Sequence, residues 1–339
     1  MKRHAMILML AAALAMPALA DITNLSRLGT AYGWQSGTVQ SGPGNINDGT
    51  GSGYTGHGTY YGSTTAPSDG WYYILWDDVQ TVQSMRWWTS LAAPGRGLSS
   101  FTLWMLNDGA DPTLDTSWTK LGDYDVPNQQ YQLVILPAAV STQAIKLSYT
   151  DQSVGGQGPL TGEFEIFGRD MTPLTATILD ASPQMNGPAT NAVDNHMMTR
   201  YGSANLNGGQ GFMELSLGSE PVAVGAMQIY FSVQANWYAP PEAFTVSWWD
   251  ADANDGDGGW VPLYSETGWK ITDFIFSRDL ASPVVTDKIR LDVITPRAMP
   301  SLSGGSFGVA EFYLFAPIPE PATMTLLALG GLALLRRRQ

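Results

Sequence analysis

The sequence predicts an all-β protein made of two tandem antiparallel β-sandwiches, and three observations point to it. The 339 residues include 37 glycines, 21 prolines and 12 tryptophans, which favours many short strands joined by turns over helices. Along segments such as 226–233, apolar residues occupy every second position, the period of a half-buried strand. Similar blocks of sequence recur about 145 residues apart, as expected for two copies of one domain.

The composition excludes several classes of function. The chain has no cysteine and three histidines, so disulfides, thiolate catalysis, iron–sulfur clusters and cysteine-ligated zinc are ruled out. It carries 17 basic and 30 acidic residues, and five of the basic ones lie at its two ends. Residues 21–319 therefore hold 12 basic and 29 acidic residues, a net charge of −17. Such a body repels phosphate backbones, so nucleic acid is not an expected partner.

The first 20 residues have the layout of a secretory signal peptide. Basic residues at positions 2–3 precede an apolar run over 5–15 and an Ala-Leu-Ala finish at 18–20. A basic start, an apolar centre and a small-residue end are the three parts of such a signal. We therefore expect residues 1–20 to be removed and the mature chain to begin at Asp21.

The body that follows consists of two matching copies. The blocks of the first copy are an Asp loop at 47–50, a Tyr-Gly-Ser segment at 61–63, and strands at 101–104, 118–121, 145–147 and 163–167. Their counterparts, in the same order, are 193–196, 201–203, 244–247, 260–263, 289–291 and 311–315. We expect one sandwich over residues 21–169 and another over 174–316. The junction at Arg169–Pro173 is short and ends in proline, which favours two domains lying close together.

The order of these blocks resembles the discoidin, or coagulation-factor C-type, galactose-binding-like sandwich. An early Asp loop, a strand like 212–218, a Phe-Thr-Val strand, a Trp-led strand, an Ile-Arg-Leu strand and a terminal Glu-Phe strand carry the resemblance. It covers residues 174–316 well and 22–168 more loosely, because the first copy has a Gly-rich insertion at 49–62. The resemblance implies that both copies are jelly-roll, discoidin-like β-sandwiches.

The resemblance also implies a structural calcium ion in each copy. Members of the family hold Ca²⁺ with the early Asp loop, a Glu at the start of the last strand and backbone carbonyls. The matching positions are Asp48 with Glu163 and Asp194 with Glu311. Hard oxygen ligands from two distant segments suit Ca²⁺. The alternative is that the aspartates cap turns while the glutamates lie at strand edges.

A denser acidic run at residues 250–257 resembles an EF-hand loop only superficially. Its glycine falls one position late, and Val261 occupies the twelfth position, where a bidentate Glu is required. The Asn-Asp-Gly triplet at 254–256 lies between two expected strands and instead predicts a hairpin turn. Loose cation binding is the alternative.

Discoidin-like domains meet their ligands with the loops at one end of the sandwich, which implies two sets of candidate residues. Sugar binding needs exposed aromatic faces with planar polar groups nearby. The candidates in the second copy are His196, Arg200, Tyr201, Trp237, Tyr238 and Arg297. The candidates in the first copy are His57, Tyr60, Tyr61 and Arg96. The segment 237–241 places two large rings beside two prolines and predicts a rigid loop; the alternative is rim packing, while Trp87, Trp104 and Trp248 are expected in packing roles.

The last residues, 317–339, form a second targeting segment. Its parts are the triplet Pro319, Glu320 and Pro321, an apolar stretch over 322–335, and the arginines Arg336, Arg337 and Arg338. A helix of about 14 residues reaches about 21 Å, short of the roughly 30 Å hydrocarbon core. The order of these parts resembles the PEP-CTERM sorting signal of Gram-negative bacteria. That resemblance implies an exosortase-type enzyme as partner, at least transient anchoring in the inner membrane, removal of the tail and delivery to the cell surface or extracellular matrix. The alternative is an ordinary anchor helix, with its arginines on the cytoplasmic side.

Catalysis is not expected from this chain. His57 and His196 lie outside Ser-elbow and HExxH contexts, and no spacing of carboxylates predicts a glycosidase pair. The sequence instead predicts an exported, surface-sorted bacterial protein that binds extracellular polysaccharide or other glycans in the matrix or in adhesion, with avidity from its tandem copies. The alternative is a non-catalytic structural surface protein without a sugar site.

Overall fold

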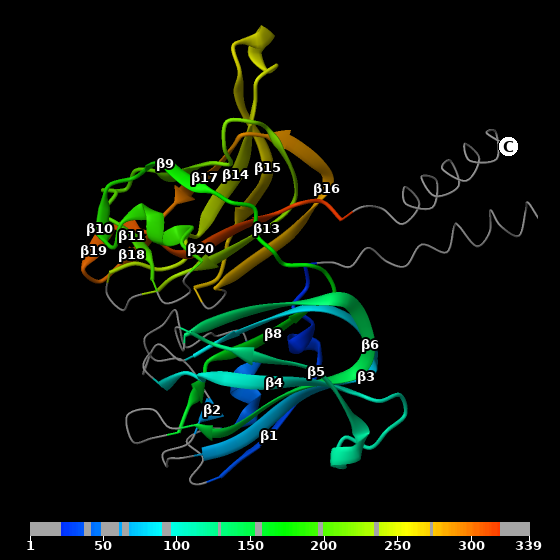
Figure 1. Ribbon diagram of the computed structural model, residues 1–339. Coiled ribbons are helices and arrows are strands. Elements are labelled where there is room, and N and C mark those ends of the chain that lie inside the picture. Colours follow the sequence, from blue (N-terminus) through cyan, green and yellow to red (C-terminus); the bar gives the residue numbers. More distant parts are fainter. Residues whose placement is uncertain are drawn as a thin grey trace, which may run out of the picture.

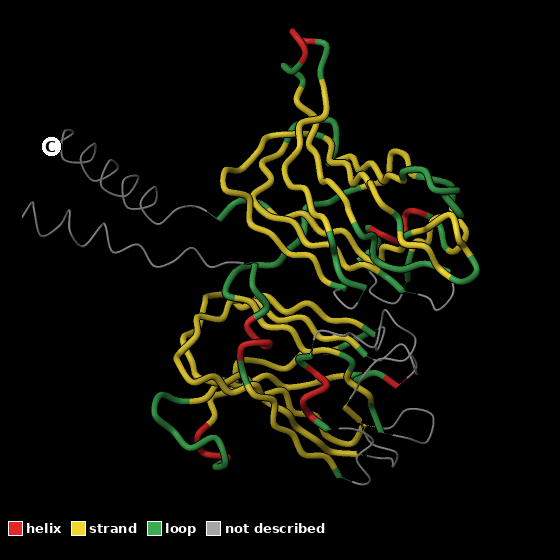
Figure 2. Tube along the Cα trace, turned by 180° about the vertical axis from the view of Figure 1, so that it is seen from behind, coloured by secondary structure: helices red, strands yellow, loops and turns green. Residues whose placement is uncertain are grey.

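The computed structural model describes residues 22–36, 42–48, 61–62, 68–89, 96–127, 130–152, 158–195, 199–233, 237–271 and 274–318. They form two antiparallel β bodies in contact with each other, and their helical segments are short 3₁₀ turns (Figures 1 and 2). The all-β class predicted from the sequence is confirmed. Within this described part of the chain, none of the helical turns has the length and apolar character needed to cross a bilayer.

The elements of the two bodies follow in chain order. The first body comprises η1 (Leu25–Leu28), β1 (Thr30–Gln35), η2 (Pro43–Ile46), β2 (Tyr61–Gly62), β3 (Ser68–Trp88), β4 (Ser100–Leu106), η4 (Asp115–Ser117), β5 (Trp118–Asp125), β6 (Tyr131–Gln152), β7 (Leu160–Thr161) and β8 (Glu163–Phe167). The second comprises β9 (Thr177–Ala181), β10 (Gln184–Asn186), η5 (Ala189–Ala192), β11 (Tyr201–Ser203), β12 (Gly211–Ser216), β13 (Val222–Phe231), β14 (Ala243–Asp250), η6 (Asn254–Gly256), β15 (Gly259–Thr267), β16 (Ile275–Thr286), β17 (Lys288–Thr295), β18 (Arg297–Met299), β19 (Leu302–Ser306) and β20 (Gly308–Phe315).

The first body forms two layers because its two longest strands bend across both. The outer sheet has the order β1-β3-β6-β4-β5, and β8 pairs with the far end of β3. Residues 70–75 of β3 pair with β1, whereas residues 84–88 pair with β8. Register shifts between Leu75 and Gln80 lie between these two halves. The core enclosed by the layers includes Tyr72, Ile74, Trp87, Leu147 and Phe164.

The second body repeats this strand order with shorter strands. Its sheets have the orders β15-β14-β17-β12-β9 and β10-β11-β20-β13-β16. β12 and β13 correspond to the two halves of β3, and β17 and β16 correspond to the two halves of β6. With this correspondence, each strand has the same neighbouring strands in both bodies. The Tyr-Gly pairs at 61–62 and 201–202 also make equivalent pairings, with β7 and β20 respectively. The repeat read from the sequence is therefore present in the strand order.

The half-buried pattern expected for residues 226–233 is wrong on one face. Met227, Ile229 and Phe231 point into the core of the second body, as predicted. Gln228 and Tyr230, on the other face of β13, are also 0% exposed. They are covered by the first body, a neighbour that no local pattern in β13 reveals.

The contact between the two bodies, termed the seam, is a core of its own. Its buried residues are Ile22, Trp88, Phe167, Met171, Ala226, Tyr230, Phe274, Ala310, Tyr313 and Phe315. Arg86, only 1% exposed, lies among these rings. Its guanidinium carbon is 4.8 Å from the ring centre of Phe167, 5.4 Å from that of Tyr230 and 5.0 Å from that of Tyr313. The arginine of one body is thus enclosed by rings of both.

Hydrogen bonds connect the two bodies around Arg86. Its Nη2 donates to Oε1 of Gln228 at 2.5 Å, and its Nε lies 3.6 Å from Oε2 of Glu165. The hydroxyl of Tyr230, on the second body, donates to the same Glu165 oxygen at 2.7 Å. Although burial disfavours its charge, the pKa of Arg86 is raised overall by Tyr230 and Glu165, so the guanidinium remains charged in the seam.

The two ends of the described chain meet at the edge of the seam. Asp279 accepts hydrogen bonds from the backbone N–H of Ile22 and from Nη1 of Arg169, both at 2.8 Å. Nη2 of Arg169 donates to the carbonyl oxygen of Ala316 at 2.7 Å. One cluster therefore joins the start of the first body, the junction and the end of the last strand.

The acidic run between β14 and β15 is the predicted hairpin turn. Asn254, Asp255 and Gly256 have φ values of 54°, 58° and 93°. Such left-handed backbone favours Asn, Asp and Gly. The hairpin projects from the second body at the top of Figure 2.

Candidate functional site

A loop at residues 237–242 closes one end of the second body and is anchored by a buried ring. Tyr238 is 0% exposed and lies against Gly202 and Gly308. A Cβ atom added to either glycine would overlap carbon atoms of the ring. The next residue, Ala239, bridges to Phe307. The ring and the two glycines therefore fix the loop to β11 and β20.

Arg297 holds the other side of this loop. Its guanidinium donates to the carbonyl oxygens of Pro240 at 3.2 Å and Trp269 at 2.6 Å. It also donates to Oε1 of Glu242 at 3.1 Å. The sequence places Arg297 among the ligand-binding candidates, but in the structure its donors stabilise the loop framework.

Trp237 is the ring that this framework presents to solvent. Its side chain is 41% exposed, although Tyr238 next to it is buried. Its carbonyl oxygen accepts a hydrogen bond from the hydroxyl of Ser306. The loop that follows Trp237 is therefore held before any ligand arrives, which lowers the entropy lost on binding.

Polar groups lie close to the hydroxyl of Tyr238. Nδ2 of Asn186 donates to it at 3.3 Å. Arg200 directly precedes β11, whose Gly202 lies against the Tyr238 ring. Burial raises the pKa of Tyr238, while the positive charge of Arg200 acts in the opposite direction. Arg200 is half-buried, and its carbonyl oxygen accepts from Nδ2 of Asn191 at 3.0 Å. An exposed indole, a guanidinium and an amide therefore share this end of the body.

Two of the rings predicted to meet a ligand are interior, so the expectation that they face outward is wrong. Tyr201 is 0% exposed, and its hydroxyl donates to the carbonyl oxygen of Ser182 at 2.6 Å. Tyr238 is equally buried because it fills the space left by the two glycines. His196 lies outside the described residues.

The first body uses its described candidates as framework. Tyr61 is 2% exposed, and burial raises the pKa of its hydroxyl. Its ring packs edge-on against Tyr72, with centres 6.1 Å apart. Arg96 donates through Nε and Nη2 to the carbonyl oxygen of Gly158, at 3.0 and 2.8 Å. His57 and Tyr60 lie outside the described residues.

The predicted calcium residues occupy equivalent places in the two bodies. Asp48 follows η2 and Asp194 follows η5, and each turn contacts the last strand of its own body. On those strands, Glu163 and Glu311 are both 0% exposed, whereas the two aspartates are exposed. Oδ2 of Asp194 accepts from the hydroxyl of Thr199 at 2.8 Å.

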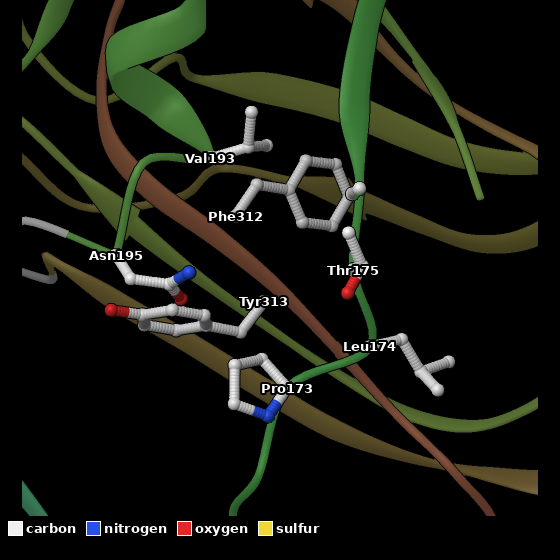
Figure 3. Close-up of a pocket in the computed structure, with 8 residues that line it drawn as sticks. Pro173, Leu174, Thr175, Val193, Asn195, Phe312 and Tyr313 are labelled. Carbon is white, nitrogen blue, oxygen red and sulfur yellow. The ribbon is translucent and has the colours of Figure 1, made fainter. Parts of the chain in front are cut away.

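Figure 3 shows the place in the second body, where a small cavity of about 80 Å³ separates the Asp loop from β20. Its lining residues are Pro173, Leu174, Thr175, Ala176, Val193, Asn195, Phe312 and Tyr313. Asp194 and Glu311 adjoin these residues in sequence, so their segments are neighbours. Across the part of the chain that the structure describes, no three His, Cys, Asp or Glu side chains gather as metal ligands. A calcium ion here would therefore take most of its oxygens from the backbone.

A group of rings that the sequence prediction omits covers part of the outer sheet of the first body. Tyr32 and Trp34 on β1 are 42% and 51% exposed. Their register partners on β3 are Tyr73 and Trp71. The sequence contains a signal for this group, because residues two apart on a strand share a face. Tyr32 and Trp34 form one such aromatic pair, and Trp71 and Tyr73 form another. This signal is overlooked when rings are sought only in end loops.

Comparison with known proteins identifies the C-terminal segment. Residues 317–339 match the model of the PEP-CTERM protein-sorting motif. The chain therefore carries this motif, as its final residues predict. Among curated proteins, none matches the chain.

Solved structures with a similar arrangement have low sequence identity to this chain. An F-lectin (fucolectin) from the serum of the striped bass Morone saxatilis is 13% identical and covers 88% of this chain and 99% of its own, with a TM-score of 0.34. The CBM32-1 and CBM32-2 domains of Clostridium perfringens ZmpB are 10% identical and cover 87% and 94%, with a TM-score of 0.34. The allantoicase of Saccharomyces cerevisiae is 15% identical and covers 73% and 76%, with a TM-score of 0.31. The strand order of the chain itself defines its architecture.

Proposed function

We propose that this protein is exported, sorted at the inner membrane by an exosortase-type enzyme and delivered to the cell surface or extracellular matrix, where it binds glycans without catalysis. The sorting motif at residues 317–339 supports the route. The observation that carries the binding proposal is Trp237, an exposed indole on a loop held by Tyr238 and Arg297. A fixed aromatic face beside planar polar donors suits the C–H faces and hydroxyl groups of a sugar ring.

In this proposal the residues around Trp237 have separate roles. The indole stacks on the sugar, and the half-buried guanidinium of Arg200 donates to hydroxyl oxygens. Tyr238 and Arg297 do not touch the ligand but position the loop. Because the seam fixes the two bodies to each other, a bound glycan would hold both of them in one orientation.

Replacing Trp237 with alanine is expected to weaken glycan binding at least tenfold, because the stacking face is lost while the loop remains anchored. A glycan array with the purified exported protein identifies a ligand, and titration calorimetry on the best one measures the change. Ile294→Ala is a matched control, since Ile294 is also 41% exposed and lies on the same body. Unchanged affinity in Trp237→Ala would contradict the assignment, and absence of any glycan ligand would favour the structural alternative.

We also propose that each body binds a structural Ca²⁺ between its Asp loop and its last strand, with Asp48 and Glu163 in one and Asp194 and Glu311 in the other. The support is the equivalent placement of the two pairs and the burial of both glutamates. A carboxylate at such a depth gains from a bound cation.

Calcium is accordingly expected to raise the melting temperature of the exported protein. A ligand that binds only the folded state at 100 times its Kd adds about 2.7 kcal/mol of stability per site. Glu311→Gln should remove part of the calcium-dependent increase, whereas Asp252→Asn, in the hairpin turn, should not. Equal melting temperatures in excess calcium and in chelator would disprove the calcium sites without affecting the glycan proposal.

A further inference from the structure

We propose that the outer sheet of the first body carries a second glycan site, separate from the end loop at Trp237, and that it takes a neutral polysaccharide. The site lies over β1, β3, β6, β4 and β5. In Figure 1, β1 is on the side of the first body that faces away from the second. It is therefore open to a long chain that the seam would not obstruct.

Aromatic rings make up the floor of this site. The ring of Tyr73 is at the centre: its centre lies 5.0 Å from that of Tyr32 and 5.5 Å from that of Trp71, with interplanar angles of 23° and 13°. Trp118 packs on its other side at 5.4 Å. Cross-strand pairing places Trp34 opposite Trp71. The stacking holds Tyr32, Tyr73 and Trp71 in place, while Tyr32 and Trp34 remain partly open to solvent.

A groove of about 360 Å³ runs beside these rings. It is lined by Trp71, Tyr73, Pro112, Thr113, Asp115, Trp118 and Lys146. One wall is the turn before β5, which is fixed by a hydrogen bond from Nε1 of Trp118 to the carbonyl oxygen of Pro112 at 3.2 Å. The volume falls in the range of sites that hold small ligands.

The polar groups of the groove combine donors and acceptors. Nζ of Lys146 lies 4.3 Å from the ring centre of Trp118 and 5.5 Å from that of Trp104. Burial lowers the pKa of Lys146, and the nearby carboxylate of Asp115 partly offsets this effect. Lys146 can donate to a hydroxyl oxygen while Asp115 accepts from a hydroxyl proton. A sugar hydroxyl, which both donates and accepts, satisfies such a pair.

The second body keeps only part of this ring cluster: Phe212 and Trp260 are the counterparts of Trp71 and Trp118, whereas Glu214 replaces Tyr73. There the equivalent of Lys146 is Arg290, which lies 2.7 Å from Asp292 and 3.8 Å from Glu214. In the antiparallel register of β12 and β17, Phe212 lies opposite Asp292 and Glu214 lies opposite Arg290. Arg290 also lies over the rings of Phe212 and Trp260, so this face of the second body combines rings with ion pairs. The stacked pair of Tyr32 and Tyr73 is specific to the first body, because Asp180 and Glu214 occupy these positions in the second.

The chemistry of the site selects a neutral ligand. The chain between its two targeting segments has a net charge of −17, which repels an acidic polysaccharide. Asp115 at the groove adds to that repulsion, and Lys146 opposes a cationic sugar. A neutral sugar chain satisfies both the rings and the Lys–Asp pair.

Affinity gel electrophoresis of the exported protein in hydroxyethylcellulose, galactomannan and laminarin tests the site. The Trp237→Ala protein is used as background, so that binding at the end loop does not contribute. At least one of these neutral polysaccharides should retard this background protein, and adding Trp71→Ala or Lys146→Met should weaken the retardation at least tenfold. Trp34→Ala, whose side chain is 51% exposed, should weaken it without affecting the fold, as a thermal melt would confirm.

Leu179→Ala is the matched control, because Leu179 is 50% exposed on the equivalent edge strand of the second body. It should leave the retardation unchanged. The proposal is overturned if no neutral polysaccharide retards the background protein, if only alginate or chitosan does, or if Trp71→Ala and Trp34→Ala behave as Leu179→Ala. It is also overturned if sedimentation shows a dimer that Trp34→Ala dissociates, since the face would then bind a second copy. The loss of glycan affinity on introducing Trp237→Ala alone tests only the end loop. The proposal for the end loop and the proposal for the outer sheet can therefore fail independently.

Discussion

Replacing Arg86 with methionine is expected to destabilise the protein by about 3–5 kcal/mol, because it removes one partner of a buried ion pair. Glu165 would keep the hydrogen bond from Tyr230 but lose its cation, and Gln228 would lose its donor. Three aromatic rings would also lose the guanidinium that they enclose. Urea unfolding followed by tryptophan fluorescence measures the change in the free energy of unfolding.

The pH dependence of this variant follows from Glu165. Burial raises the pKa of Glu165, while Arg86 and the Tyr230 hydroxyl lower it in the native protein. Without Arg86 the folded-state pKa rises further above the unfolded value, so the folded state favours the protonated carboxyl. The contribution of Glu165 to the stability of the variant is fully present below the pKa of Glu165 in the unfolded state. It is lost as pH rises through the pKa of Glu165 in the folded state. The deficit of Arg86→Met should therefore be smaller near pH 4.5 than near pH 7.5.

Two controls separate the seam from general effects of removing an arginine. Arg278 lies over the rings of Tyr264 and Phe276, but it is exposed, so Arg278→Met should change stability by no more than about 0.5 kcal/mol. The double variant Arg86→Met with Glu165→Leu should recover much of the loss, because no unpaired charge remains buried. A deficit that persists unchanged in the double variant would contradict the ion-pair explanation.

Replacing Tyr238 with alanine is expected to cost about 3–5 kcal/mol, the usual range for truncating a buried aromatic side chain. The cavity would lie between Gly202 and Gly308, two positions without side chains that could move into it. Glycan binding at Trp237 should also weaken, because the loop loses its anchor. Calorimetric melting and the same glycan titration measure the two effects.

Tyr238→Phe is the control for this prediction. It keeps the ring and removes the hydroxyl together with its hydrogen bond from Asn186, so the expected cost is about 0.5–1.5 kcal/mol. Glycan affinity should stay close to that of the native protein. If the alanine and phenylalanine variants bound glycan equally well, Tyr238 would have no role in positioning Trp237.

The strands of each body and their repetition could be predicted from the sequence, but the order of the strands in the sheets and the residues of the seam could not. The blocks at 145–147 and 289–291, or 163–167 and 311–315, lie on corresponding strands, because alternation and turn residues are local signals. Arg86, in contrast, occupies a strand position that local alternation assigns to solvent. Its partner Gln228 is distant in sequence, and only the packing of two complete sheets brings them together.

The sequence predicted which segment forms the end loop, but not which of its residues face solvent. Of the adjacent rings of Trp237 and Tyr238, one is exposed and the other is interior. Which ring is interior depends on the glycines of β11 and β20, which lie far away in the sequence. The same long-range dependence explains why Arg297 stabilises the loop instead of facing solvent.

The position of the last strand determines how the protein responds to tension. β20 lies between β11 and β13 and is hydrogen-bonded on both sides, and it ends at the cluster of Arg169 and Asp279. A pull on the C-terminus along this strand acts across the direction of its ladder bonds, so they are strained together and not one after another. If a glycan holds the first body at the same time, the force passes from β20 to that body through the junction, the cluster of Arg169 and Asp279, and the rings around Arg86. Mechanical strength in such an attachment would then depend on the contact between the sandwiches as much as on either sandwich.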